Sequence, residues 1–73
     1  MKRYRHEGDD TGVEAYRTTP TSIFVKFRDS DRVYEYSNAS AGTANVAKMK
    51  RLAAAGKGLS TFITRHVRDR YVR

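Results

Sequence analysis

The spacing of the apolar residues changes once along this chain, near Ser37, and this change limits the folds that the chain can adopt. Before it, apolar and polar residues alternate in three short runs, and turn-rich sequences separate the runs. A period of two is typical of strands that bury one face. The pattern therefore predicts three short antiparallel strands in the runs GVEAYR, SIFVKFR and RVYEYS.

The turn sequences predict how these strands pair. Across the DSD turn, Phe27 is expected to face Tyr34 and Val25 to face Tyr36, because a shift by one residue would bury the carboxylate of Glu35. Tyr34 and Tyr36 are therefore expected in the core.

A three-residue turn at Thr19-Pro20-Thr21 would place Tyr16 opposite Phe24. That pair would lie on the sheet face that points away from the helices.

After Ser37 the apolar residues follow a helical period. A first helix is expected to begin near Thr43 and to end at Gly56, because threonine caps helices and glycine adopts the left-handed stop. Ser60 is the expected cap of a second helix. The expected apolar stripes are Val46, Met49, Leu52 and Ala53 on the first helix, and Leu59, Phe62, Ile63, His66 or Val67 and Tyr71 on the second.

These elements predict an α+β fold in which a three-stranded antiparallel meander is followed by two helices packed on one face (βββαα). Residues 1–12 mix charges of both signs without a period, so we expect a flexible N-terminal arm. Residues 13–73 are expected to form one domain. At 73 residues in total, a hydrophobic core gives only about 3–5 kcal/mol of stability.

Composition excludes several kinds of site. The chain has no cysteine, so it can form neither a disulfide nor a thiolate metal site. Its two histidines, His6 and His66, stand at opposite ends of the sequence, so no metal or cofactor is expected. We predict a cytoplasmic protein without a membrane span, because no apolar run approaches the necessary length. No serine or threonine has a histidine at a spacing typical of catalysis, and we do not expect an enzyme.

Charge is divided unequally between the two halves of the chain. Residues 1–37 hold seven basic and seven acidic residues, whereas residues 38–73 hold eight basic residues and one acidic residue, Asp69. The second half therefore carries the whole formal net charge of +7. Such asymmetry is typical of a surface that meets phosphates, although it also serves solubility. The candidate nucleic-acid-binding residues are Lys48, Lys50, Arg51, Lys57, Arg65, Arg68 and Arg70.

The sequence Gly56-Lys57-Gly58 raises the question of a phosphate-binding loop. A Walker loop requires a glycine where this chain has Arg51 and a hydroxyl residue where it has Gly58. We therefore predict a joint between two helices. A helix N-terminus near Ser60 could still hold a single phosphate.

Proteins that bind single strands often combine basic residues with exposed aromatic rings. Tyr16 and Phe24 are the candidates for stacking on bases. The alternative is that this outer sheet face docks a protein partner or a second copy of the chain, or that the N-terminal arm covers it through Tyr4. The expected state is a monomer or a weak dimer.

Several residues, in this order, resemble the KTSC domain, a short bacterial module found at the C-terminus of some lysyl-tRNA synthetases and as a free-standing protein. The resemblance lies in Tyr34-Glu35-Tyr36 after a hairpin, then Phe62, then Val67-Arg68, and finally Tyr71. It implies the βββαα architecture and, from the synthetase context, RNA binding. We therefore expect a small non-enzymatic module that binds nucleic acid, RNA in particular.

Overall fold

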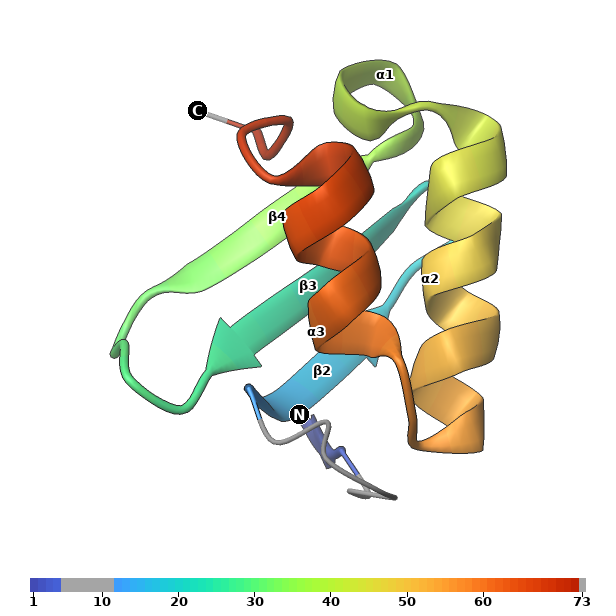
Figure 1. Ribbon diagram of the computed structural model, residues 1–73. Coiled ribbons are helices and arrows are strands. Elements are labelled where there is room, and N and C mark those ends of the chain that lie inside the picture. The colour runs from blue at the N-terminus through green and yellow to red at the C-terminus, as the bar shows by residue number, and fades with distance from the viewer. Residues whose placement is uncertain (5–11, 73) are drawn as a thin grey trace.

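Three strands form where the alternating pattern predicts them. The computed structural model describes residues 1–4 and 12–72. Strands β2 (Val13–Thr18), β3 (Ser22–Phe27) and β4 (Val33–Ser37) form an antiparallel meander in sequence order. The helices cover one face of this sheet (Figure 1), and alternate residues of the strands, such as Ile23 and Val25, are buried. The α+β class is therefore confirmed.

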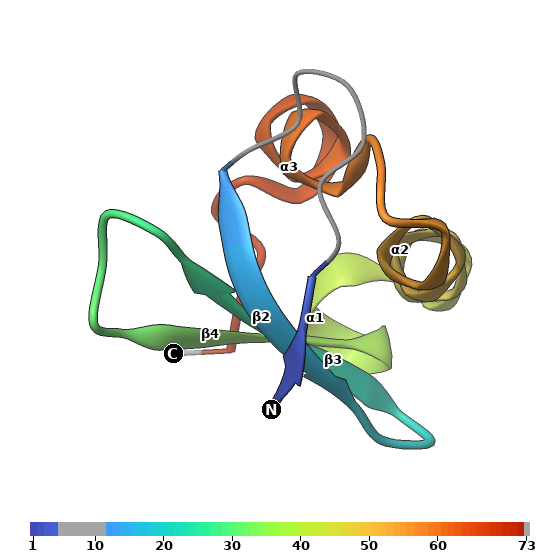
Figure 2. The ribbon, with the colours of Figure 1, turned by 90° about the horizontal axis from the view of Figure 1, so that it is seen from below.

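A fourth strand, which the sequence did not predict, extends this sheet at its edge. Strand β1 (Lys2–Arg3) pairs with β2, so the sheet order is β1-β2-β3-β4 (Figure 2). Tyr4 follows it and is buried, and its N–H donates to the carbonyl of Glu14 at 3.1 Å. The prediction of a flexible arm was thus wrong for residues 1–4. The rest of that arm, residues 5–11, lies outside the described residues.

The predicted pairing of β3 with β4 has the right faces but the wrong partners. Val25 lies opposite Tyr34 rather than Tyr36, and Tyr36 lies opposite Ile23. The connection is longer than expected, because the β3–β4 ladder already ends at Lys26 opposite Val33. A shift of two residues keeps each side chain on its expected face.

Ser37 ends β4 and also begins a helix. Its side chain accepts from the backbone N–H of Ser40, and the Ser40 hydroxyl accepts from the N–H of Ser37, which is a capping box. The short helix α1 (Asn38–Ala41) follows. Helix α2 (Thr43–Ala55) then begins after Gly42, so Thr43 is its first residue and not its cap.

Gly56 ends α2 in the left-handed conformation, with φ 79°. Its N–H donates to the carbonyl of Ala53 at 3.2 Å, and the N–H of Lys57 donates to that of Leu52 at 3.4 Å. This pattern is a Schellman motif, which satisfies the last carbonyls of the helix. The prediction that Gly56 stops the first helix is confirmed.

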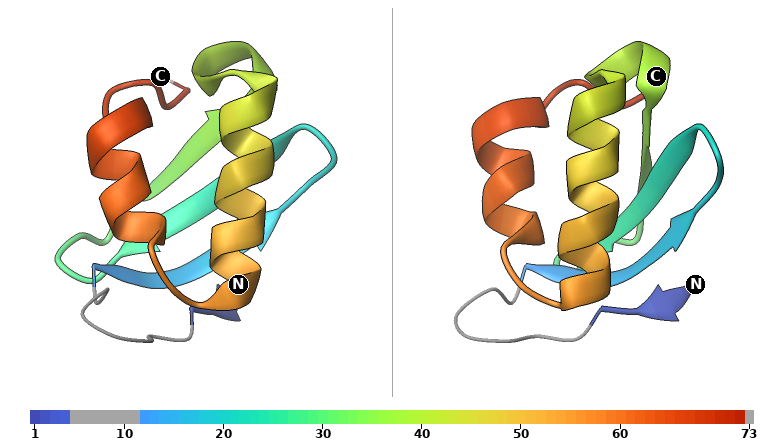
Figure 3. Two further views of the ribbon diagram at one scale, coloured as in Figure 1. Left: turned by 45° about the vertical axis from the view of Figure 1, so that its right-hand side comes forward. Right: turned by 90° about the vertical axis from the view of Figure 1, so that its right-hand side faces the viewer.

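The second helical segment has an unusual geometry. Helix α3 (Leu59–Phe62) continues directly into a π-helix, η1 (Ile63–Val67). α3 begins after Gly58, so Ser60 is not its cap. This segment and α2 lie side by side on one face of the sheet (Figure 3). The core between the layers contains Val13, Ile23, Val25, Tyr36, Val46, Met49, Leu59, Ile63 and Val67.

Candidate functional site

The unequal distribution of charge along the sequence becomes an unequal distribution of charge between the sheet and the helical layer. The positive half of the chain, from residue 38 onward, builds the helical layer on one side of the sheet (Figure 1). Within the described part of the chain, six of the seven predicted binding residues have exposed side chains that form no ion pair. These six are Lys48, Arg51, Lys57, Arg65, Arg68 and Arg70.

Lys50 is the seventh, and it has a structural contact. Its side chain is half-buried, and its ammonium donates to the carbonyl of Thr19 at 2.6 Å. The contact ties α2 to the turn between β2 and β3. Because this carbonyl already occupies the ammonium, Lys50 is less suited to a phosphate than its exposed neighbours.

Tyr4 reaches the N-terminus of α3. Its buried hydroxyl accepts a hydrogen bond from the N–H of Leu59 at 3.3 Å. The expectation of a phosphate at this helix start is therefore weakened, because a side chain of the protein itself takes one of the N–H groups. Gly56-Lys57-Gly58 connects two helices, with both glycines at positive φ.

The predicted stacking pair of Tyr16 and Phe24 does not exist. Tyr16 lies opposite Val25 and is buried on the inner face, whereas Phe24 lies opposite Arg17 on the outer face. Tyr16 instead packs edge-on against Tyr4, with ring centroids 6.4 Å apart.

The length of the turn between β2 and β3 caused this error. The N–H of Thr19 donates to the carbonyl of Ser22 at 2.9 Å, so Pro20 and Thr21 alone form the turn. This turn is one residue shorter than predicted, and such a change reverses the face of every side chain on one strand. The β2 ladder also has an irregularity between Val13 and Ala15.

On the outer sheet face, the polar and charged side chains around Phe24 contact one another. The guanidinium of Arg17 lies 4.4 Å from the centre of the Phe24 ring. Beside it, the Ser22 hydroxyl donates to the Glu35 carboxylate at 2.7 Å, and Lys26 pairs with Glu14 at 3.1 Å. Phe24 is thus half-covered by the protein's own cation.

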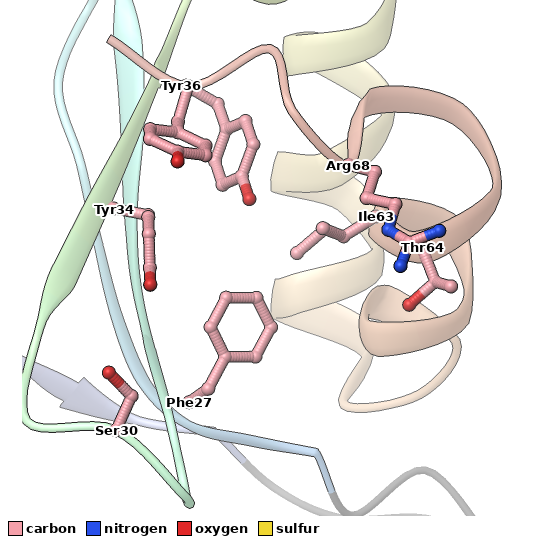
Figure 4. A pocket seen from close by; sticks show the side chains of 8 residues that line it. Phe27, Ser30, Tyr34, Tyr36, Ile63, Thr64 and Arg68 are labelled. Atoms are coloured by element: carbon pink, nitrogen blue, oxygen red, sulfur yellow. The ribbon is translucent and has the colours of Figure 1, made fainter. Parts of the chain in front are cut away.

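A pocket of about 260 Å³ opens between the sheet and η1 (Figure 4). Aromatic rings form much of its wall: Phe27, Tyr34, Tyr36 and Tyr71. Tyr34 is the centre of this cluster, since its ring centroid lies 4.8 Å from that of Tyr71 and 5.8 Å from that of Phe27, both edge-on.

The helical wall of this aromatic pocket carries polar groups. Ile63 points toward the rings, and Thr64 and Arg68 lie beside it on the helical side (Figure 4). Ser30, in the loop between β3 and β4, also lines it. Thr64 and Arg68 are exposed, so they stand at the mouth. A pocket with aromatic walls and few polar groups has the composition of a small-ligand site.

Tyr36 remains a neutral phenol in this environment. Burial first of all, and then the neighbouring Tyr34, Tyr71 and Asp69, raise its pKa from 10.0 to about 12. At neutral pH the Tyr36 hydroxyl can therefore both donate and accept hydrogen bonds.

The Tyr-x-Tyr sequence serves both core and pocket. Tyr36 is buried as predicted, but Tyr34 is half-buried, as are Phe62 and Tyr71, whereas Val67 is fully buried. Sequence reasoning missed Phe27, Ser30 and Thr64 as pocket residues. The spacing of Tyr34 and Tyr36 indicated that both face the core. No signal in the sequence indicated that a pocket opens between the sheet and the helices beside Tyr34.

The described residues contain no group of histidine or acidic side chains that could hold a metal ion. His6 lies outside the described residues, and His66 is exposed and packs against Phe62, with ring centroids 4.5 Å apart. None of the described helices is long and apolar enough to cross a membrane.

Comparison with known proteins found no relative of this chain. No protein-family model matches it, and neither the curated proteins nor the solved structures contain a match. The resemblance to the KTSC domain therefore stays a prediction.

Proposed function

We propose that this domain is a non-enzymatic module that binds single-stranded nucleic acid, with RNA as its preferred partner. One observation carries the proposal: the helical layer holds six exposed cations that no described carboxylate neutralises. Phosphates spaced along a strand are the partner that such a surface suits, because each contact releases a counterion.

The chemistry of the cations favours this assignment over a merely soluble surface. Arg65, Arg68 and Arg70 follow one another within the last turns of the chain, and the planar guanidinium can hold a phosphate through two hydrogen bonds. RNA is preferred over DNA on the resemblance to a synthetase-associated domain. We expect weak affinity and a steep dependence on salt.

The test measures binding of a mixed-sequence single-stranded RNA by fluorescence anisotropy over a series of salt concentrations. The variant is Arg65→Ala/Arg68→Ala/Arg70→Ala. If all three arginines contact phosphates, the slope of log affinity against log salt should fall by about 2. Circular dichroism should show an unchanged fold, because these side chains are exposed.

The matched control removes the same charge from the sheet layer and its loop. Arg3→Ala/Arg17→Ala/Arg28→Ala replaces three exposed arginines, so both variants have the same net charge. The control should keep most of the wild-type slope. Equal slopes for the two variants would assign the effect to net charge and contradict an interface on the helical layer. Absence of binding at low salt would reject the function and favour a protein partner.

A further inference from the structure

The aromatic pocket between β4 and η1 has the size and walls of a site for one ring system. Its volume is about 260 Å³, below the range of pockets that hold drug-sized ligands. Phe27, Tyr34 and Tyr71 supply ring surfaces from the sheet side and the C-terminal segment. Aromatic walls of this kind favour a planar ring as the ligand, because stacking stabilises the complex irrespective of the substituents of the ring.

The polar groups of the pocket can form hydrogen bonds with the edge of such a ring. Ser30, Thr64 and Tyr34 are hydroxyl-bearing residues of its lining. The Ser30 hydroxyl already accepts from the N–H of Arg32 at 3.0 Å, and the Thr64 hydroxyl already donates to the carbonyl of Ser60 at 3.1 Å, so Ser30 can donate to a ligand and Thr64 can accept from one. Tyr36 also lines the pocket, and its phenol is a neutral hydroxyl group at neutral pH. A ring with alternating donors and acceptors, as in a nucleobase, can use all of these groups.

The charges near the pocket determine whether an anionic or a cationic ligand is favoured. Aromatic cages also bind quaternary ammonium groups. Here, however, Arg68 lines the pocket, and the Arg32 guanidinium lies 5.7 Å from the centre of the Tyr34 ring. Asp69 lies near Tyr36 but does not line the pocket among the described residues. Arg32 lines a neighbouring hollow and not this pocket. The guanidinium of Arg68 on the lining disfavours a cation and favours a ring that carries a phosphate.

The π-helix contributes to this arrangement. The hydrogen bonds of a π-helix join residues five apart. Ile63 begins η1 and Arg68 follows its last residue, and both line the pocket. The Ile63 side chain points into the gap, whereas the Arg68 side chain lies over the helix beside Thr64 (Figure 4). π-Helical turns are rare and occur frequently at functional sites.

We propose that this pocket takes one unpaired nucleobase of the bound strand, with the adjoining phosphate on Arg68. The inference rests on the proposed function and assigns the base-binding site within it. The base stacks against Tyr34 and Tyr71, and the hydroxyl groups of Ser30 and Thr64 contact its edge. The other helical cations hold the strand on either side.

The decisive variant fills the mouth without removing a core contact. Thr64→Trp adds a large ring at an exposed position of the lining. Thr61→Trp is the matched control, because Thr61 is exposed on the preceding α3 and does not line the pocket. Arg68→Gln and Arg65→Gln form a second pair, since both remove one exposed charge but Arg65 does not line the pocket.

Each protein is titrated with a single-stranded RNA oligomer and with an abasic oligomer of the same length and charge. Wild type and Thr61→Trp should bind the base-containing strand about tenfold more tightly, and Thr64→Trp should lose that preference while binding the abasic strand unchanged. Arg68→Gln should weaken binding of the base-containing strand more than Arg65→Gln. Equal preference in Thr64→Trp and Thr61→Trp would overturn the pocket assignment and leave RNA binding intact.

A second measurement separates the pocket from the polymer interface. A nucleoside monophosphate is added to wild type, and the ring resonances of Phe27, Tyr34 and Tyr71 are followed by NMR. Shifts at these rings that are absent in Thr64→Trp support the site, whether or not long RNA binds. An absence of shifts at millimolar nucleotide would overturn it even if the salt titrations support RNA binding.

Discussion

Tyr4 gives the sharpest test of the fold, because the sequence and the structure assign it different places. The sequence placed it in a flexible arm or, as an alternative, over the outer sheet face. The structure buries it to 1% exposure, packs it edge-on against Tyr16 and hydrogen-bonds its hydroxyl to the N–H of Leu59. The free energy of unfolding should therefore depend strongly on residue 4.

The expected losses follow from these contacts. Tyr4→Phe keeps the ring and removes the hydrogen bond, which should lower the free energy of unfolding by about 1 kcal/mol. Tyr4→Ala also removes the buried ring, and truncating a large core aromatic costs about 3–5 kcal/mol. Since a chain of this size has about 3–5 kcal/mol in total, Tyr4→Ala should be largely unfolded at room temperature.

Urea unfolding followed by circular dichroism measures both variants. Arg3→Ala is the control, because Arg3 is the last residue of β1 and directly precedes Tyr4 but is exposed, and its effect should stay within about 0.5 kcal/mol. If Tyr4→Ala unfolds with the midpoint of Arg3→Ala, residue 4 is not part of the core and the four-stranded sheet is refuted. Tyr4→Phe remains informative should Tyr4→Ala fail to fold.

Two further predictions concern the pocket and the helix joint. The pKa of Tyr36 is raised from 10.0 to about 12, so the unfolded chain loses this proton first and stability should fall as pH rises from about 10 to about 12. The decrease in the free energy of unfolding attributable to Tyr36 is on the order of 3 kcal/mol. Tyr36→Phe should remove that part of the pH dependence. An equal decrease in the wild type and in Tyr36→Phe would contradict the assignment. Gly56→Ala should lower the free energy of unfolding by about 1 kcal/mol, because φ is 79° there; an unchanged thermal midpoint would refute the left-handed stop.

The sequence predicted element types well because they follow from periodicity within one segment. The alternation in β2, β3 and β4 and the helical stripe of α2 are local patterns, and the structure has all of them. The glycine stop at Gly56 is local too. Fold class and the separation of charge between layers therefore followed from the sequence.

Pairing was predicted less well because it depends on turns whose length the sequence does not state. TTPT fits a turn of two or three residues, and the choice decides whether Tyr16 lies inside or outside. The structure has the shorter turn, which buries Tyr16 and leaves Phe24 on the outer face beside Arg17. β1 was missed for a related reason. So short a strand shows no alternation of apolar and polar residues, and it forms only because the edge of β2 is available for pairing.

The aromatic pocket arises where the two layers end at different points. Tyr34 and Tyr36 share the inner face, but Tyr36 lies opposite Ile23 in the core, whereas Tyr34 lies nearer the hairpin loop and lines two neighbouring hollows. Beyond η1 the chain turns back, and the N–H of Val72 donates to the carbonyl of Glu35 at 2.6 Å. That bond covers the β4 edge and brings Tyr71 onto Tyr34. The ring surfaces of the pocket thus come from segments far apart in sequence, which is why a strand pattern could predict Tyr34 as inward-facing but not as a residue open to a ligand.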